Sequence, residues 1–421
     1  MPTPTTTNAF YAQSGGVTSV INASACGVIE TARHHRGRIG TVYAGRNGIL
    51  GALDEDLIDT GTEPDEAIAA LRYTPAGAFG SCRYKLKSLE KNRREYERLI
   101  EVFRAHGIGY FFYNGGGDSA DTCFKISQLS ESMGYALTAI HVPKTIDNDL
   151  PLTDCCPGFG SVAKYVAVST LEASLDTRSM AASSTKVFVI EVMGRHAGWI
   201  AAAGGLLADH GIPVVVLFPE IDFDGPRFLA RVDAMVKQHG YCSVVVSEGC
   251  HHPDGRFLAE QDARDAFGHV QLGGAAPVVA QLVKASLGHK CHWAVADYLQ
   301  RAARHIASRT DVEQAYAVGR RAVELALEGH NAVMPTIERT ADAPYAWELG
   351  MAPLAEVANV ERKMPREFIT EDGYGITEAG KRYLRPLIEG EDYPRYRGGL
   401  PVYATLANAA VPRRLPAFER G

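Results

Sequence analysis

Seven short apolar runs, rich in Val, Ile, Phe and Tyr, recur along the chain, and longer segments with a helical pattern separate them. Two of these longer segments end in His-Gly, as the C-termini of helices often do. A strand that is apolar along its whole length must be covered on both faces, so this alternation predicts a mostly parallel sheet flanked by helices. The runs cover residues 8–13, 39–45, 108–114, 136–142, 186–192, 212–218 and 241–247.

Length and composition favour a multidomain globular protein. The chain has 421 residues, of which 46% are hydrophobic and 22% charged. A formal net charge of −6 argues against general nucleic-acid binding, which usually needs a basic surface. No apolar run approaches the roughly 20 residues that span a bilayer, residues 1–16 do not resemble a signal peptide, and the eight cysteines are scattered without a CxxC pair. We therefore expect a cytoplasmic protein that binds neither nucleic acid nor membrane.

The order of the segments predicts two Rossmann-like α/β domains of three layers each, with the functional site in the cleft between them. One boundary lies near residue 160, where the stretch CCPGFGSV leads into a new helix, and the chain crosses back near 298–301. The first domain would comprise residues 1–160 and about 299–345, and the second 161–298. We expect the charged, Pro-punctuated tail, 346–421, to form a helical appendage packed on the second domain.

Polar clusters directly follow five of the expected strands. In an open parallel sheet, ligands bind outside the carboxyl ends of the strands, so these side chains are expected to face one crevice. The clusters are SGG at 14–16, NGGGDS at 114–119, PKTIDND at 143–149, MGRHAG at 193–198 and SEG at 247–249.

Two of the clusters have the form of anion cradles. Each places glycines between a strand and a helix, where the backbone can approach a ligand and the helix offers free N–H groups. Gly16 belongs to the first cradle, and Asp118 and Ser119 follow the glycines of the second. Taken singly, such a turn is more often an ordinary N-cap. Two of them in one sheet, together with PKTIDND, favour an anion site.

Cations and carboxylates accompany the cradles. An isolated Lys or Arg is usually a solvated surface charge, but glycine or proline frames Lys144 and Arg195 at strand ends. In an extended loop Asp147 and Asp149 point the same way, so that one can act as a base while the other orients it or helps with metal. Such a crevice suits phosphoryl transfer, in which a carboxylate accepts the hydroxyl proton and Mg²⁺ bridges phosphates. The other candidate cations are Arg83, Lys85, Lys186 and Arg301.

These motifs resemble those of the phosphofructokinase family, and the match covers most of the chain. TIDND at 145–149 followed by EVMGR at 191–195 is a specific pair. The segment QLGG at 271–274 and the tail from VERKMPREF onward are more similar to the bacterial pyrophosphate-dependent branch than to the ATP-dependent enzymes. The other matching motifs are SGGxxxxxN near the start, GSxR at 80–83, GGxxS, GF at 158–159, SEG, and LQR followed by SRTD.

The resemblance implies a role for each matching residue. Asp147 would take the proton from the 1-hydroxyl of fructose 6-phosphate, with Thr145 and Asp149 in support. Lys186 would reach the sugar phosphate from a neighbouring subunit, so a homodimer or homotetramer is expected. The residues implied to hold the phosphoryl donor are Gly16, Arg83, Lys85, Asp118 and Ser119, and those implied to hold the sugar phosphate are Met193, Gly194, Arg195, Glu248, His292, Tyr298 and Arg301.

Lys144 and Asp118 bear on the identity of the donor. ATP-dependent relatives have glycine where Lys144 stands, and GGDGS where this chain has GGGDS. A carboxylate at Asp118 would repel the α-phosphate of ATP, while an added ammonium compensates for the binding energy that adenosine would supply. The resemblance therefore implies a reversible reaction of Mg-pyrophosphate with fructose 6-phosphate that gives fructose 1,6-bisphosphate and phosphate, in glycolysis or gluconeogenesis.

Two departures from the family pattern affect these roles. Gly117 stands where the ATP-dependent enzymes have an aspartate that helps to hold Mg²⁺. Magnesium would then rely on the phosphates, on water, and on Asp118 or Asp149. His292 stands where many relatives have an arginine that contacts the sugar phosphate, and Lys290 is near it in the chain.

A third departure and two alternatives complete the interpretation. Cys26 and Glu30 stand where allosteric relatives carry effector-binding arginines, so we expect a non-allosteric enzyme. The near alternative is an ATP-dependent sugar-phosphate kinase of the same fold, which an assay with both donors separates. The distant alternative is a non-catalytic regulatory subunit. The intact TIDND argues against it, because a chain freed from chemistry need not keep both aspartates.

Overall fold

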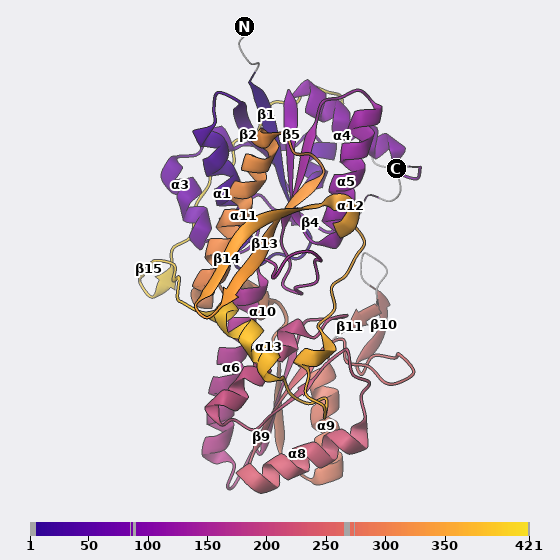
Figure 1. The fold of residues 1–421 in the computed structure, drawn as a ribbon, viewed down its shortest axis with the longest axis vertical. Helices are drawn as coiled ribbons and strands as arrows, with labels where there is room; N and C mark the ends of the chain where they lie inside the picture. Colours follow the sequence, from indigo (N-terminus) through magenta and orange to yellow (C-terminus); the bar gives the residue numbers. More distant parts are fainter. Residues whose placement is uncertain (1–5, 85, 87–89, 265–269, 273, 420–421) are drawn as a thin grey trace.

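The computed structural model describes residues 6–84, 86, 90–264, 270–272 and 274–419. The chain forms two α/β domains, one above the other in Figure 1, each built on its own sheet. The strands of the first sheet are β1 (Thr7–Ser14), β2 (Ile39–Gly45), β3 (Leu57–Asp59), β4 (Ser81–Cys82), β5 (Ile108–Gly115), β6 (Thr138–Pro143), β13 (Val333–Asp342) and β14 (Tyr345–Pro353). Their order is β14-β13-β6-β5-β1-β2-β3, and β4 pairs with β1.

The centre of the first sheet is parallel, as the apolar runs predict. Strands β13, β6, β5, β1 and β2 run in one direction, while β14 and β3 pair antiparallel at the two edges. Neighbouring residues of β1 face opposite sides: Phe10 packs in one buried cluster and Tyr11 in another. The helices of this domain are α1 (Ile21–His34), α2 (Ile49–Leu53), α3 (Asp65–Ala70), α4 (Arg93–Ala105), α5 (Gly117–Ser132), α11 (Arg309–Glu328) and α12 (Leu354–Val357).

The second domain is built on a parallel sheet in the order β12-β7-β9-β8. Its strands are β7 (Val187–Val192), β8 (Val214–Leu217), β9 (Cys242–Ser247) and β12 (Cys291–Val295), and β10 (Glu260–Arg264) pairs separately with β11 (Val270–Leu272). The sequence did not predict β12, because CHWAV is short and its side chains at the sheet edge are mostly exposed. The helices are α6 (Phe159–Met180), α7 (Trp199–Ala202), α8 (Gly225–His239), α9 (Ala275–Leu287) and α10 (Asp297–Ala302).

The sequence predicts that the C-terminal segment packs on the second domain alone. In the structure it contacts both domains, so this prediction was wrong. Strand β14 begins at Tyr345 and pairs along its length with β13 of the first sheet. Further on, the N–H of Asp59 donates to Ala409 O (2.8 Å), and the N–H of Val411 donates to Leu57 O (2.9 Å). The hydrophobic pattern alone does not predict either pairing, because the exposure of the side chains alternates along β14 and prolines are frequent in the tail.

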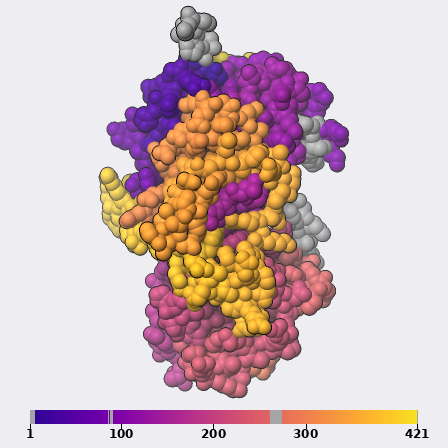
Figure 2. Space-filling model, viewed as in Figure 1, coloured from indigo at the N-terminus to yellow at the C-terminus, as the bar shows by residue number. Residues whose placement is uncertain are grey.

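Only the middle of this segment lies at the junction of the two domains. Figure 2 shows the orange and yellow chain running across the face of the molecule from the first domain to the second. The C-terminal segment contains α13 (Glu378–Leu384), β15 (Tyr396–Arg397) and β16 (Leu400–Pro401). The 3₁₀ helices are η1 (Thr60–Thr62), η2 (Leu71–Tyr73), η3 (Ala203–His210), η4 (Arg304–Ile306), η5 (Arg366–Phe368) and η6 (Arg385–Ile388). In the described part of the chain, none of the helices has the length and apolar character that a bilayer crossing requires.

Candidate active site

A cavity of about 610 Å³ lies between the two domains, at the carboxyl ends of their strands. Its walls come from the turns after β1, β5 and β6 in the first domain and after β7 and β9 in the second, with α10 and residues 361–363 completing them. The structure thus brings together all five polar clusters. The sequence-predicted residues that line the cavity are Gly16, Arg83, Asp118, Ser119, Lys144, Thr145, Asp147, Asp149, Met193, Arg195, Glu248, Tyr298 and Arg301.

The first-domain side of the cavity gathers cations around the turn after β1. Lys144 Nζ donates a hydrogen bond to Gly16 O (2.6 Å). A Cβ on Gly16 would lie 2.7 Å from Arg301 Nη1 and 3.6 Å from Arg83 Nη2, so the absence of a side chain lets both guanidinium groups approach the backbone. Asp118 is the second residue of α5 and lines the same side. Three cations and one carboxylate therefore surround the two glycine turns.

The ammonium of Lys144 is almost fully buried, with 4% of the residue exposed. Burial is the largest cause that lowers its pKa to about 8; the cations Arg301 and Arg83 act in the same direction, while Asp147 opposes the shift. A buried ammonium without a full set of partners favours an anion beside it. This position therefore suits a negatively charged ligand.

The loop after β6 carries the carboxylates and is turned rather than extended. The N–H of Asp147 donates to Thr145 Oγ1 (3.0 Å), and Asn148 has a left-handed φ of +55°. Asn tolerates this conformation better than most residues. The buried amide of Asn148 donates to Tyr383 Oη (2.8 Å) and accepts from the N–H of Cys156 (3.0 Å). The premise of an extended loop was wrong, yet Asp147 and Asp149 still line one cavity.

Burial shapes the acid–base behaviour of both aspartates. It raises the pKa of Asp147 to about 7, with Asp149 and Glu248 adding repulsion and Lys144 opposing it. Burial also raises the pKa of Asp149, against hydrogen bonds that stabilise its ionised form. A carboxylate with a pKa near neutrality is a competent general base. The Asp147 carboxylate lines the same cavity as the cations of Lys144, Arg83 and Arg301, where phosphoryl transfer would need a proton acceptor.

The second-domain side of the cavity presents Arg195 and Glu248. The N–H of Gly194 donates to Glu248 Oε1 (3.4 Å), and a Cβ on Gly249 would lie only 2.0 Å from Arg195 O, so the two turns pack backbone against backbone. Burial raises the pKa of Glu248, and the Arg195 charge opposes this. Across the cavity, Arg301 Cζ lies 3.8 Å above the ring of Tyr298, which is 59% exposed.

Three predicted residues are not among those that line the cavity, and one cannot be placed. Gly194 lies between the lining residues Met193 and Arg195. Lys186 Nζ donates to Ala181 O (2.7 Å), and His292 is exposed on the edge strand β12. Lys85 lies outside the described residues. The structure of one chain therefore leaves the roles of these four residues as predictions.

The tail supplies site residues that motif analysis missed. Glu361, Arg362 and Lys363 line the cavity, and Glu361 Oε1 lies 3.2 Å from Nδ1 of His196. His196 belongs to the MGRHAG cluster but was not singled out. The only signal for the three tail residues was that VERKMPREF resembles the pyrophosphate-dependent branch. Asp297, at the start of α10, is a further lining residue that was not predicted.

The side chains around the cavity provide only some of the ligands that a divalent metal needs. Within the described residues, no three His, Cys, Asp or Glu side chains are grouped so that they could hold an ion. However, Oδ1 of Asp149 is buried and has no hydrogen-bond partner among them. A Cβ on Gly117 would meet nothing within 4 Å, so space is open beside Asp118. The protein can thus offer a carboxylate oxygen to a metal held mainly by other ligands.

Comparison with family models gives a direct result. The model described as Phosphofructokinase matches residues 8–326, well over half of the chain. The chain belongs to the phosphofructokinase family. The family transfers phosphoryl groups and generally needs a divalent metal, which agrees with the anion cradles and the partial donor set.

Individual relatives of this phosphofructokinase are similar over nearly their whole length. Pyrophosphate–fructose 6-phosphate 1-phosphotransferase of Methylococcus capsulatus is 74% identical over 412 residues, covering 97% of this chain and 98% of that protein. The enzyme of the same name from Xanthomonas campestris is 58% identical, covering 98% and 99%. The crystal structure of the pyrophosphate-dependent phosphofructokinase from Nitrosospira multiformis has a TM-score of 0.92 and 69% identity, covering 98% and 100%.

Proposed function

We infer that this phosphofructokinase transfers a phosphoryl group from pyrophosphate to the 1-hydroxyl of fructose 6-phosphate, giving fructose 1,6-bisphosphate and phosphate. The observation that carries the inference is the buried ammonium of Lys144 at the donor turns, in a chain 74% and 58% identical to relatives named for this reaction. The two phosphoryl compounds are comparable in energy, so the reaction runs in both directions.

The donor half of the cavity suits a short phosphate chain of high charge. Lys144, Arg83 and Arg301 converge on Gly16, where the backbone allows close approach. Ser119 follows in the first turn of α5, and the positive end of the helix dipole there favours an anion. Asp118 lies at the same helix start, where its carboxylate would repel a third phosphate. Pyrophosphate satisfies the cations without meeting that repulsion.

Asp147 is proposed as the base that accepts the proton of the 1-hydroxyl. Its pKa of about 7 lets it be ionised near neutral pH and still bind a proton strongly. Thr145 fixes the start of the loop through the N–H of Asp147, and the nearby charge of Asp149 strengthens the base. The transfer itself depends mainly on positioning and on cations near the phosphates.

The acceptor half is proposed to hold fructose 6-phosphate. Arg195 and Arg301 supply positive charge for the sugar phosphate, and Glu248 can accept hydrogen bonds from sugar hydroxyls. Met193 and Tyr298 provide contact surface beside them. The φ of +128° at Gly194 requires glycine, which keeps this turn close to Ser247.

We propose that a second copy of the chain, in a homodimer or homotetramer, completes the sugar-phosphate site. Lys186 and His292 both lie at the β7–β12 edge of the second sheet, away from the cavity of their own chain. On the same edge strand, Trp293 is 53% exposed and Val295 is 44% exposed. Apolar side chains on an unpaired edge strand favour burial by another chain.

Magnesium is the metal that we propose for this site. When bound, Mg²⁺ would neutralise charge on the phosphate chain as the transferred group moves. The residues present would contribute Asp149 through its unpartnered oxygen, and Asp118 at the start of α5. Because Gly117 offers no carboxylate, most of the ligands would be phosphate oxygens and water.

The proposed reaction can be followed directly by ³¹P NMR. With Mg²⁺, pyrophosphate and fructose 6-phosphate, we expect the pyrophosphate signal to decrease while fructose 1,6-bisphosphate and phosphate increase together. Starting from the two products should give the reverse change. The Asp147→Asn variant serves as the matched control and should show neither conversion in the time that the wild type takes to complete it. Absence of both conversions with the wild-type protein would refute the proposed function.

A further inference from the structure

The loop that carries the two aspartates is held by an arginine from the C-terminal segment. Arg362 Nη2 donates to Asn148 O (2.9 Å), and Nε donates to the same oxygen (3.1 Å). Its Nη1 donates to Thr153 O and to Asp154 O (2.7 Å), and its backbone N–H donates to Asp149 O (2.7 Å). One residue, about two hundred positions away in the sequence, therefore binds four carbonyl oxygens of the loop.

The same arginine contacts the second domain. Arg362 Cζ lies 4.9 Å from the centre of the Trp199 ring, and Nε1 of Trp199 donates to Arg362 O (3.4 Å). Trp199 begins α7, directly after the cluster that contains Arg195. A planar guanidinium can stack on an aromatic ring and bond carbonyl groups at its edge simultaneously. Arg362 is thus a rigid link between the loop of the base and the turn of the acceptor site.

We propose that Arg362 is a positioning residue for phosphoryl transfer, which sets the place of Asp147 relative to the sugar bound by the second domain. The proposal rests on the proposed function of the site. Its physical basis is that Asp147 and Arg195 lie on different domains, so the distance between base and acceptor depends on a contact that spans both. Small displacements of reacting groups reduce rates strongly.

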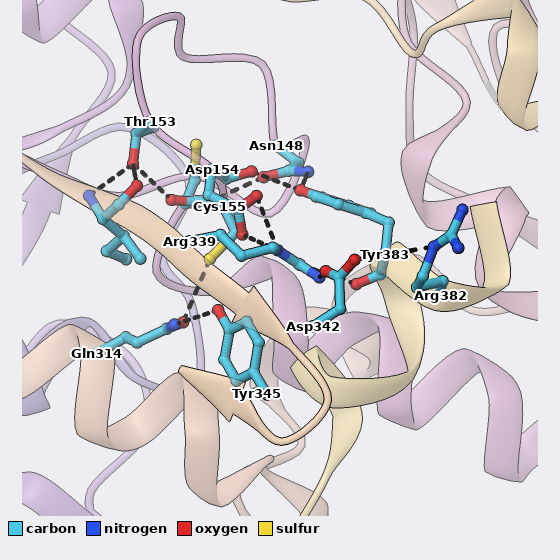
Figure 3. A network of polar contacts seen from close by, with 12 residues as sticks. Asn148, Thr153, Asp154, Cys155, Gln314, Arg339, Asp342, Tyr345, Arg382 and Tyr383 are labelled. Atoms are coloured by element: carbon cyan, nitrogen blue, oxygen red, sulfur yellow. Dashed lines mark hydrogen bonds and ion pairs between the residues drawn. The ribbon is translucent and has the colours of Figure 1, made fainter. Parts of the chain in front are cut away.

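Other contacts also hold the fold of the loop, and one of them reaches Trp199, because the ring of Tyr383 lies 5.2 Å from the ring of Trp199. Tyr383 Oη donates to Asp154 O (2.6 Å) and accepts from Asn148. Arg339 pairs with the carboxylate of Asp154 (3.1 Å) and donates to Tyr383 O (3.0 Å). Figure 3 shows this second set of contacts on the loop, with Arg339 between Asp154 and Asp342. Because these supports persist, a change at Arg362 should leave the loop folded, but the loop loses the side-chain hydrogen bonds by which Arg362 fixes its place.

The test replaces Arg362 by Gln and by Lys and measures kcat and KM for both substrates. For Arg362→Gln we expect kcat to fall about 100-fold while each KM changes by less than about threefold, since the substrates' own contacts remain. Arg362→Lys should recover only part of kcat, because an ammonium lacks the planar fork. The matched control is Arg366→Gln, an exposed arginine in the same segment whose side chain, among the described residues, bonds only Ile369 O and Thr370 O. It should retain wild-type kcat.

A double-mutant cycle separates positioning from general loosening of the protein. In an Asp147→Asn background, Arg362→Gln should lower the residual rate by less than about threefold, because the group that it positions is gone. An equal loss in both backgrounds, a wild-type kcat in Arg362→Gln, or the same loss in Arg366→Gln would each overturn the proposal. Wild-type activity measured alongside keeps these outcomes distinct from failure of the proposed function, in which the unaltered protein would itself be inactive.

Discussion

At the scale of single residues, the site depends on two buried charges whose pKa values approach each other. Burial brings the pKa of Lys144 down to about 8 and that of Asp147 up to about 7. Near neutral pH the lysine is therefore still charged, while the aspartate can gain or lose a proton readily. One loop therefore carries both Asp147, which can take the proton of the acceptor hydroxyl, and Lys144, which can bind a phosphate of the donor. No apolar pattern in the sequence gives these shifts, because they arise from burial.

The pH dependence of donor use tests Lys144. Its ammonium is present below pH 8 and lost above it, so kcat/KM for pyrophosphate should fall by about tenfold per pH unit on the alkaline side. In Lys144→Arg the charge persists at all accessible pH values, and this alkaline decline should move upward. Steady-state rates from pH 7 to 10 at fixed free Mg²⁺ measure both profiles. A wild-type profile that stays flat to pH 10 would contradict the assignment.

Removing the charge of Asp147 should separate activity from stability. The folded-state pKa is raised above the unfolded value, so ionising this carboxyl costs stability progressively as pH rises toward 7. Asp147→Asn should therefore lower kcat by about a thousandfold or more, while its Tm at pH 8 equals or exceeds that of the wild type. Thermal unfolding and turnover measured on the same preparations give both quantities. A clear fall in Tm with kcat retained would contradict the role of base.

At the scale of elements, the sequence predicts the turns that follow the strands, but it does not predict the contacts that hold these turns in place. Continuous apolar runs identified β1, β5, β6, β7 and β9, and the polar residues after them line one cavity because parallel strands end at one edge. The short edge strand β12 and the left-handed turn at Asn148 gave no such signal. The tail residues 361–363 were equally hidden, since their place depends on contacts with distant carbonyl groups.

The turn after β1 offers a test of close approach. In Gly16→Ala the new Cβ would lie 2.7 Å from Arg301 Nη1, so the guanidinium must move away from the donor turn. We expect KM for pyrophosphate to rise about tenfold with a small change in Tm, because one cation contact is weakened. The matched control is Gly37→Ala, where a Cβ meets nothing within 4 Å. Binding titrations and thermal unfolding of both variants measure the effect. An unchanged KM in Gly16→Ala would contradict the proposed donor site.

At the scale of the whole molecule, the cavity exists only because two domains and the tail meet. The boundaries near residues 160 and 298 stay predictions, whereas the tail contacts both domains. The path of the tail depends on the pairing of β14 with β13 and on hydrogen bonds to β3. No local sequence pattern predicts either contact. The arrangement leaves the edge strand β12 outside the cavity, and this edge is where we propose that a second copy binds.

Association through that edge can be tested by changing its most exposed aromatic residue. Trp293→Asp places a charge on the apolar surface, so it should dissociate an oligomer of two or four chains toward monomer and lower activity with it. Size-exclusion chromatography with light scattering gives the mass, and an assay across protein concentration links it to turnover. A wild-type protein that is monomeric and fully active would contradict the proposed contribution of Lys186 and His292 from a neighbour.

The choice of donor is the most direct test of the account. The measurement is the ratio of kcat/KM for Mg-pyrophosphate to that for Mg-ATP, with fructose 6-phosphate saturating. Because Lys144 and Asp118 favour a donor of two phosphates, we predict a ratio of about a thousand or more. A ratio at or below one would contradict the account.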